Sequence, residues 1–314
     1  MAFNLLNKIV LLIIIVLQTQ LSYAMSGLLF DSITGPRPTS FANSYSAVAN
    51  DAYAIYENPA GLATIKTKLL QFSSYKKLEA TNSSIEYTQH IRNITLALGL
   101  KNIQLKGFEE SIMKNDTIIH TGNSFGYMGT LLTVGLGSKL LNTNFYYGVS
   151  GSKIMHQLHD ESSTGGLSCD VGFLFKQPSY SFSFGIKRLF SSSIKWNTGS
   201  QEILSRTVYV GLSKQLNKIL LTSQFDYNSN INSILKIGTE YNVLNMIYIR
   251  SGISTSVNSY TIFSNLFIDS LTAHAGVGLD LGKVDLNYSY SSVSKNNSNY
   301  LDSVYKFSVS IDFN

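Results

Sequence analysis

The sequence predicts an all-β fold: a transmembrane antiparallel up-and-down β-barrel of about 14 strands, with a short N-terminal helical or extended plug. Three observations lead to this fold class. A secretory leader opens the sequence, alternating segments fill the chain after residue 67, and the last of these segments ends on an aromatic residue. Because side chains of a strand alternate between its two faces, such segments give one apolar and one polar face, as in barrels of outer membranes.

The first 24 residues have the pattern of a cleaved signal peptide. Lys8 precedes the apolar run Ile9–Leu17, and Ser22 and Ala24 are the small residues expected before a cleavage site. A membrane-spanning helix needs about 20 apolar residues, roughly twice this run, so a cleaved leader is favoured over a helical anchor. We therefore expect residues 1–24 to be removed, residues 25–67 to form the plug and residues 68–314 to form the barrel.

The predicted plug segment does not alternate. Its most informative residues are Asp51, Asn58, Pro59, Ala60 and Gly61. An Asn at the N-cap accepts a hydrogen bond from a free backbone N–H, and a Pro at the first helical position brings a preset φ. The pattern predicts a short helical turn that begins at Pro59. Since this turn is too short to span a bilayer, a barrel must hold it in the lumen or at the periplasmic rim.

From residue 68 onward the chain consists of about fourteen alternating segments with two kinds of connection. Tight turns are predicted at 92–93, 177–178 and 282, and long polar loops at 102–123, 156–165, 190–204, 255–269 and 292–303. Outer-membrane barrels have short turns at the periplasmic rim and longer loops outside. The 4 prolines of the chain suit long strands, because proline removes a donor from the ladder.

The last segment shows the two faces most clearly. Its apolar side chains are Tyr305, Phe307, Val309, Ile311 and Phe313. About eight strands leave an interior that side chains can fill, whereas larger barrels enclose a channel. We therefore expect the apolar face to contact lipid and the polar face to line a wet lumen. The alternative is a β-sandwich that seals these apolar side chains between two sheets.

The polar face also carries charged residues of both signs. We expect them to pair across the lumen or to hold the plug: Arg92, Lys187, Lys236, Glu240, Arg250, Asp280, Asp285, Lys306 and Asp312. The formal net charge of +5 is small and dispersed, so nucleic acid is not an expected partner.

No pattern in the sequence predicts an enzyme, a metal site or a cofactor. The single cysteine, Cys169, lies on an apolar parity and is expected to act as a small hydrophobic residue. His156 and His159 have a spacing that could bind a metal ion, but their predicted place in a polar loop favours solvated surface side chains. His274 lies on the polar parity and is expected to face the lumen.

The segment Ser44–Ala63 resembles the N-terminal motif of the PorV/PorQ family of outer-membrane barrels. That family is related to the FadL-type long-chain fatty acid transporters, in which a similar Asn-Pro-Ala stretch belongs to the N-terminal hatch. Residues 236–252, 276–278 and 286–290 resemble the C-terminal half of the family. The resemblance implies a barrel of roughly 14 strands with its N-terminus folded into the lumen, and a role in protein secretion or in the passage of hydrophobic molecules.

We therefore expect a non-enzymatic protein of the bacterial outer membrane, of the PorV/PorQ type, that acts in protein secretion or envelope transport. Its expected partners are outer-membrane lipid, the barrel-assembly machinery, and secretion-system or secreted proteins. One alternative is a FadL-like channel for hydrophobic small molecules, which a strand interrupted beside the hatch, with an apolar pocket behind it, would favour. The other is a secreted β-rich binding or adhesive protein.

Overall fold

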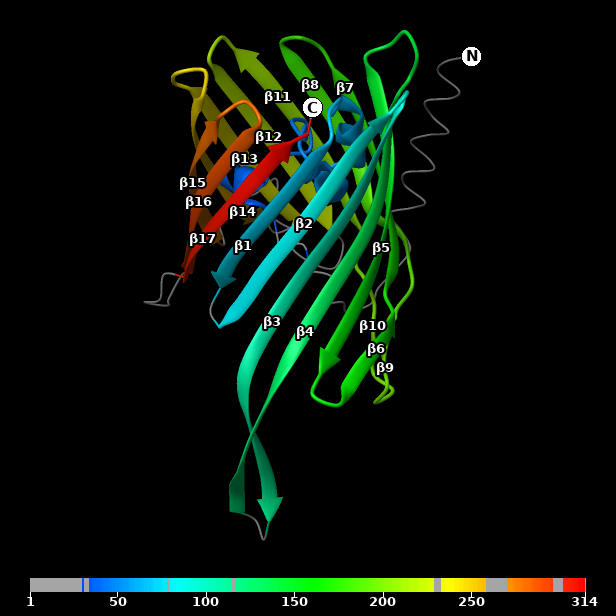
Figure 1. The fold of residues 1–314 in the computed structure, drawn as a ribbon, viewed down its shortest axis with the longest axis vertical. Coiled ribbons are helices and arrows are strands. Elements are labelled where there is room, and N and C mark those ends of the chain that lie inside the picture. Colours follow the sequence, from blue (N-terminus) through cyan, green and yellow to red (C-terminus); the bar gives the residue numbers. More distant parts are fainter. Residues whose placement is uncertain are drawn as a thin grey trace.

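The chain folds into a closed antiparallel β-barrel that holds a helical segment in its interior (Figure 1). The computed structural model describes residues 30, 34–77, 79–114, 117–228, 233–257, 270–295 and 302–313, so the predicted signal peptide lies outside the described residues. Among the described residues, no helix is both long enough and apolar enough to cross a bilayer.

Fourteen strands form the wall, in agreement with the predicted fold class. They are β1 (Leu69–Lys77), β2 (Ala80–Ile91), β3 (Ile94–Lys114), β4 (Thr117–Lys139), β5 (Phe145–Leu158), β7 (Leu167–Lys176), β8 (Tyr180–Ser191), β11 (Thr207–Leu216), β12 (Ile219–Asn228), β13 (Ser233–Asn242), β14 (Ile247–Val257), β15 (Ser270–Asp280), β16 (Val284–Lys295) and β17 (Asp302–Asp312). Each strand pairs with the next in this order, and β17 closes the barrel on β1, from Leu69 opposite Asp312 to Lys76 opposite Tyr305.

Three short strands extend the wall on one side. β6 (Glu161–Gly165) pairs with β5 and β9 (Ile194–Trp196), and β9 pairs with β10 (Gln201–Glu202). They lie at the end of the barrel opposite to the C-terminus (Figure 1). The C-terminal end carries the tight turns, such as those that join β2 to β3 and β7 to β8, and we call it the short-turn rim.

The prediction of a long loop over residues 102–123 is wrong. β3 and β4 run through most of it, 21 and 23 residues long, and form a hairpin that projects well beyond the neighbouring strands (Figure 1). Nearly all the described side chains of 117–124 are exposed, so both faces of the hairpin meet water. Backbone pairing continues there without an apolar face, and therefore without the alternation by which a strand is recognised in sequence.

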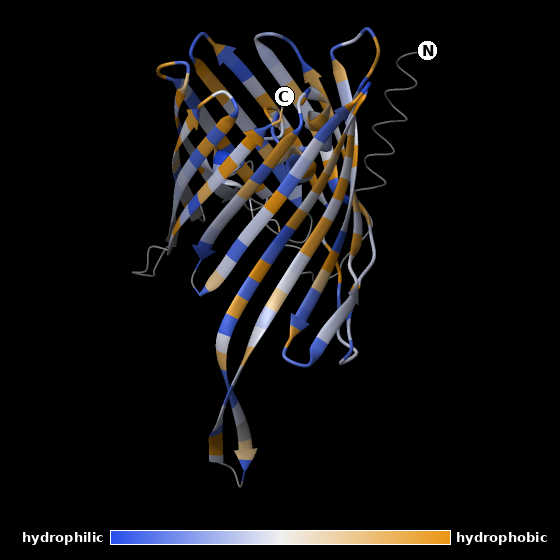
Figure 2. Cartoon of the chain, in the orientation of Figure 1, coloured by the Kyte–Doolittle hydropathy of each residue, from blue (hydrophilic) through white to orange (hydrophobic). Residues whose placement is uncertain are grey.

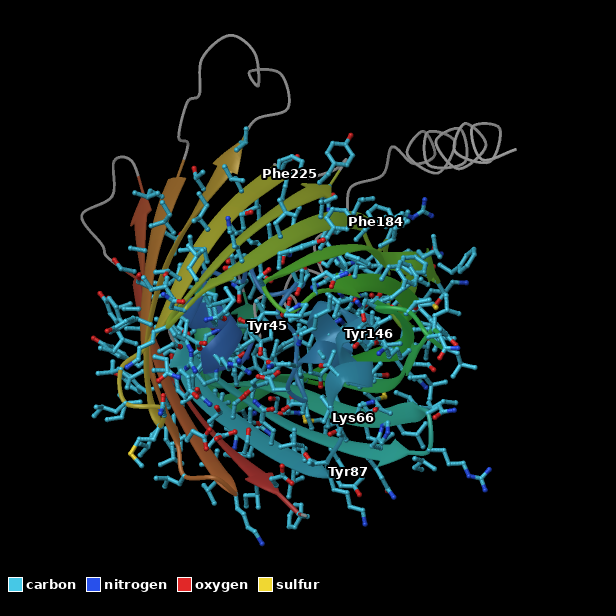
Figure 3. All side chains as sticks on the ribbon, turned by 90° about the horizontal axis from the view of Figure 1, so that it is seen from above. Tyr45, Lys66, Tyr87, Tyr146, Phe184 and Phe225 are labelled. Atoms are coloured by element: carbon cyan, nitrogen blue, oxygen red, sulfur yellow. The ribbon has the colours of Figure 1, made fainter. Side chains whose placement is uncertain are left out.

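The two faces of the wall differ as predicted, which rules out the β-sandwich. Tyr305, Phe307 and Phe313 are 55%, 45% and 51% exposed on the outside, whereas Lys306 and Ser308 between them are buried. Figure 2 shows the same alternation as bands along the other strands, and Figure 3 shows Phe184 and Phe225 at the wall with Tyr45 in the interior. So many exposed large apolar side chains on one continuous surface are suited to lipid.

Residues 34–65 lie inside the barrel, and we call them the plug. They contain the helices α3 (Pro36–Ser40) and α4 (Ala54–Glu57) and the 3-10 helix η1 (Pro59–Thr64). The main apolar core is made chiefly by this segment, because its fully buried side chains include Phe41, Tyr45, Tyr53, Ile55 and Leu62. A lumen of 14 strands is too wide to be filled by wall side chains alone, and the plug occupies much of that space.

Candidate functional site: the plug and the wall around it

Asn58 joins the two halves of the plug and ties them to the wall. Its side-chain Oδ1 accepts a hydrogen bond from the Ala60 N–H at 3.1 Å, which caps η1 at the predicted Pro59 start. Its Nδ2 donates to the carbonyl of Ser46 at 2.9 Å and to that of Phe173 on β7 at 3.3 Å. Because Asn58 is fully buried, each of these polar atoms needs its partner. The motif therefore fixes both the local turn and its position against β7.

Asp51 is the centre of a second set of contacts, close to the short-turn rim. One carboxylate oxygen accepts from the Tyr45 hydroxyl at 2.8 Å and lies 3.3 Å from Arg37, and the other accepts from the Tyr53 N–H at 3.1 Å. Arg37 also donates to Asn50 at 2.8 Å. Burial raises the pKa of Tyr45 well above its ordinary value, although Arg37 beside it acts in the opposite direction. Tyr45 therefore stays a neutral donor to Asp51.

The wall leaves room for the plug through a belt of glycines that face it. A Cβ built on Gly148 would lie 2.2 Å from the backbone carbon of Pro59, and one on Gly172 would lie 2.0 Å from Oδ1 of Asn58. Nine glycines on the strands from β3 to β15 meet plug atoms in this way: Gly99, Gly135, Gly137, Gly148, Gly172, Gly211, Gly238, Gly252 and Gly276. The nearest plug atom belongs to the backbone at Gly137, Gly148, Gly238 and Gly252 and to a side chain at the others, and a missing side chain on the wall permits both kinds of close approach.

Five of the predicted lumen charges are held by partners inside the barrel: Lys187, Lys306, Arg250, Glu240 and Lys236. Lys187 on β8 lies 3.4 Å from Glu57 of α4, and Lys306 on β17 donates to the carbonyl of Thr34 at 3.0 Å, so both reach the plug. Arg250 lies 2.6 Å from Glu240 on the neighbouring strand and 2.7 Å from Asn287. Lys236 pairs with Asp226 at 2.5 Å.

Of the other four predicted lumen charges, Asp280 and Asp285 line a cavity between the plug and the wall, whereas Arg92 does not face the lumen. Arg92 follows β2 in a tight turn with a φ of +57° and is exposed, so the expectation that it lines the lumen is wrong. The reason is that β2 ends at Ile91, one residue before the parity would place Arg92 inside. Asp280 and Asp285 face each other across the β15–β16 turn and are half-buried, as is Asp312 near the end of β17.

A polar cavity of about 360 Å³ opens between the plug and the short-turn rim. Arg37, Asp51, Glu240, Arg250 and Asp285 are among the residues that line it. We call it the rim cavity. Charged side chains of both signs bound the rim cavity. Arg37 also lines a second cavity, of about 190 Å³, beside β7 and β8.

The hydrogen-bond ladder between β7 and β8 is interrupted by a β-bulge next to the plug, while the two strands stay paired on both sides of it. The register shifts between Cys169 and Val171, where Cys169 lies opposite Phe190 but Val171 lies opposite Ile186. Asp170 fills this step by accepting the Arg188 N–H at 2.7 Å, and Arg188 has a φ of +57°. A β-bulge of this kind disrupts the ladder locally and is common near sites of function.

A small cavity of about 40 Å³ lies directly inside this interruption. Asp170 and Arg188 line it from the wall, Tyr56 and Glu57 from the plug, and Phe30 from the segment before the plug. We call it the bulge cavity. Its lining is mixed rather than apolar, because charged side chains share it with Phe30, Leu131 and Ile154.

An aromatic cluster continues from the bulge cavity toward the long-loop end of the barrel. The ring of His156 is stacked against Trp196 and Tyr127, with centroids 5.7 and 5.8 Å apart, and lies 5.8 Å from Phe30. The Tyr127 hydroxyl lies 2.7 Å from Nδ1 of His156. The predicted loop position of His156 is therefore wrong, since it is a buried residue of β5, whereas His159 lies in the exposed turn beyond.

Sequence reasoning missed the belt, the bulge and the aromatic cluster. The belt had a signal, because its glycines lie on the polar parity of strand after strand. The aromatic cluster combines Phe30, Tyr127 and Trp196 from three separate segments, and alternation within a strand carries no information on such a meeting. Among the described residues, no group of three or more His, Cys, Asp or Glu side chains is arranged to hold a metal ion.

No family model and no curated protein matches the sequence. Solved structures do match the fold. The CymD monoaromatic hydrocarbon channel superimposes with a TM-score of 0.67 at 9% identity, over 89% of this chain and 97% of that one. A Pseudomonas aeruginosa FadL homologue gives 0.62 at 11% identity, over 90% and 98%, and the P. putida toluene transporter TodX gives 0.62 at 11%, over 89% and 98%. The chain therefore has the fold of the FadL-like barrels.

Proposed function

We propose that the chain is a channel of the bacterial outer membrane that admits hydrophobic small molecules through the interruption between β7 and β8. The observation that carries this proposal is the register step at Asp170, which lies beside the plug and has a cavity behind it. Transport channels for monoaromatic hydrocarbons and toluene have the same fold, which supports a transport role rather than an enzymatic one.

The outer surface supports a place in a lipid bilayer. Large apolar side chains are exposed around the wall, for example Leu98 at 52%, Leu212 at 54% and Ile249 at 52%. In water such an exposed apolar surface would favour aggregation, whereas in a bilayer the acyl chains of the lipids contact it and keep it from water. Tyr147, Tyr180 and Tyr241 are exposed close to the short-turn rim, where outer-membrane barrels carry an aromatic girdle.

The aromatic side chains beside the bulge cavity support an aromatic cargo, although charged residues share the lining of that cavity. The cluster of Phe30, Tyr127, His156 and Trp196 offers aromatic faces next to the bulge cavity. Aromatic rings stabilise one another at these centroid separations, so a further ring is a suitable ligand. The cavity of about 40 Å³ has room for little more than a water molecule, so a cargo has to displace side chains as it enters.

A single substitution tests the route because Cys169 already lies at its edge. Phe190→Cys places a second thiol directly opposite Cys169, and paired positions on antiparallel strands lie within disulfide distance. We expect oxidised F190C to take up radiolabelled toluene into intact cells several-fold more slowly than wild type, and dithiothreitol to restore the rate. Heat-dependent gel mobility shows whether the barrel is folded in each variant.

The control is a matched engineered disulfide, which we call the control lock, between two strands whose pairing has no bulge. Phe184 on β8 lies opposite Val210 on β11, so Cys169→Ser combined with F184C and V210C closes a disulfide away from the bulge. This lock should leave toluene uptake unchanged. Equal inhibition by both locks, or no inhibition by the lock at Cys169, would refute the route through the bulge. Uptake no faster than in cells without the barrel would refute the transport function itself.

A role in protein secretion of the PorV/PorQ type is the second candidate. The segment Ser44–Ala63, which resembles the motif of that family, is its support, and this segment forms most of the plug. Deletion of the chain from its host separates the two functions. Loss of exported proteins from the cell surface with normal toluene uptake would favour secretion.

A further inference from the structure

Phe30 occupies a ring-sized place beside the bulge cavity. Its side chain is 3% exposed, although the residue belongs neither to the plug nor to the wall. On β4, Gly129 gives the ring room, because a Cβ at this glycine would lie 3.2 Å from Cζ at the tip of Phe30. Leu131 of β4 and Ile154 of β5 line the bulge cavity together with Phe30. Two neighbouring strands therefore shape the place that this ring fills.

The side chain of Phe30 has the size and chemistry of a single-ring aromatic molecule. It is a benzene ring on one methylene group, so toluene and 4-methylphenol match it closely. An apolar core cavity of about 150 Å³ is enough to bind benzene. If the ring of Phe30 moved away, the space that it leaves would join the bulge cavity of about 40 Å³, which Phe30 lines. An aromatic cargo of one ring therefore fits the place of Phe30.

His156 brings a buried polar atom to this place. The residue is 4% exposed, and the centroid of its ring lies 5.8 Å from that of Phe30. Nδ1 lies 2.7 Å from the Tyr127 hydroxyl, whereas Nε2 is buried without a hydrogen-bond partner among the described residues. Buried polar groups are nearly always paired. A ligand ring at the place of Phe30 would lie close enough to the imidazole for a substituent on that ring to pair with Nε2.

The surroundings of His156 define which substituent is suitable. The Tyr127 hydroxyl either donates to Nδ1, which leaves the proton on Nε2, or accepts from Nδ1, which leaves Nε2 as an acceptor. A hydroxyl group suits both cases, because it donates and accepts. A carboxylate is less suitable, since Glu202 accepts from Nε1 of Trp196 at 2.6 Å and Trp196 is stacked on His156. An anionic ligand would meet that negative charge at short range.

We propose that the barrel binds a single-ring phenol at the place of Phe30, with the ring of the phenol among the aromatic side chains and its hydroxyl group on Nε2 of His156. The inference rests on the proposed function, because it names the class of cargo that the channel carries. It also gives Phe30 a role. Its ring fills the site and shields it from water until a ligand displaces it.

The single tryptophan of the chain reports this binding directly. Trp196 is stacked on His156 with ring centroids 5.7 Å apart, so a ligand beside His156 changes its fluorescence. The purified full-length protein in detergent is titrated with 4-methylphenol and with toluene, which differ by one hydroxyl group. Excitation at the red edge of the tryptophan band avoids absorption by the ligands. We expect 4-methylphenol to bind about tenfold more tightly than toluene or better, because toluene leaves Nε2 unpaired.

Three variants separate a ligand contact from a structural role. His156→Phe keeps an aromatic ring but removes Nε2, so the preference for 4-methylphenol should fall to about twofold or less while toluene still binds. Tyr127→Phe is the matched control, because it removes the hydrogen bond at Nδ1 and leaves Nε2 in place, and it should keep the preference. Phe30→Ala should tighten the binding of both ligands several-fold, since neither then has to displace a ring. Heat-dependent gel mobility shows whether each variant is folded.

Equal affinity of the wild type for both ligands, or a preference that survives in His156→Phe, would overturn the inference. An equal loss of preference in Tyr127→Phe would do the same, because it would leave His156 with a structural role only. Weaker binding to Phe30→Ala would place the ligand elsewhere. Toluene uptake by intact cells, measured in parallel, separates this inference from the proposed function. Uptake without a preference for 4-methylphenol overturns the inference alone, whereas preferential binding without uptake overturns the transport function alone.

Discussion

Replacement of Gly148 by alanine should release the plug without opening the barrel. The new Cβ would lie 2.2 Å from the carbonyl carbon of Pro59, 2.3 Å from its oxygen and 2.5 Å from the nitrogen of Ala60. All three are backbone atoms, so no side-chain rotation relieves the clash. Since ordinary contact begins near 3.4 Å, η1 has to move away from β5 by about 1 Å.

The cost follows from the interactions that such a movement disturbs. Overpacking of this kind usually costs about 1–3 kcal/mol. Asn58 holds η1 to β7 and to Ser46, so its three hydrogen bonds are stretched as well. We expect the equilibrium between seated and released plug to shift by a factor of about 5 to 150, because 1.4 kcal/mol corresponds to tenfold. The wall hydrogen bonds lie outside this contact and should remain intact.

Limited digestion with chymotrypsin measures the release, since Phe41, Tyr45, Tyr53 and Tyr56 of the plug are buried. Gly151→Ala is the control on the same strand, because the nearest atom to its Cβ is 4.0 Å away. The rate of cleavage in the plug should rise for Gly148→Ala alone, with heat-dependent gel mobility unchanged in both variants. Equal protection of the plug in the two variants would refute the account of the glycine belt as a seat for the backbone.

Two further predictions concern buried polar groups. Arg250→Met leaves Glu240 without its partner at 2.6 Å, and loss of one member of a buried pair costs about 3–5 kcal/mol. The urea midpoint of unfolding should therefore fall, and the double variant with Glu240→Leu should recover most of the loss. An unchanged midpoint for Arg250→Met would show that the ion pair does not stabilise the fold. For Tyr45, burial raises the pKa in the folded state above the ordinary value of 10.0. The stability that neutral Tyr45 gives the seated plug is therefore complete below about pH 10 and is lost as the pH rises above that value. The rate of cleavage of the wild-type plug should increase above about pH 10 more steeply than the rate for Tyr45→Phe. Parallel pH profiles for the two proteins would contradict this prediction.

Much of the barrel could be predicted because period 2 is a local property. Tyr305 and Phe307 are two residues apart, and a strand places them on one face whatever surrounds it. The wide lumen then decides which face is outside. Arg92 and His156 mark the limit of this reasoning, since each lies at a strand end or loop boundary, and the point where pairing stops depends on the neighbouring strand.

The plug shows a similar division. Asn58 followed by Pro59 determines a capped turn by itself, because the cap joins residues only two positions apart. The side chains that receive the plug come from distant strands: Lys187 meets Glu57 across 130 residues, and Lys306 meets Thr34 across 272. Such pairs depend on how many strands close the barrel and how far each is shifted, which no local pattern specifies.

The sequence alone therefore determined a strand protein with an apolar outer surface and a capped segment inside, since these properties depend on neighbours along the chain. Only the tertiary structure decided where the wall carries a bulge, which glycines seat the plug and which wall charges pair with it. Those features arise from closure: when β17 meets β1, residues far apart in sequence are brought to one lumen, and the distances between them are properties of the whole barrel.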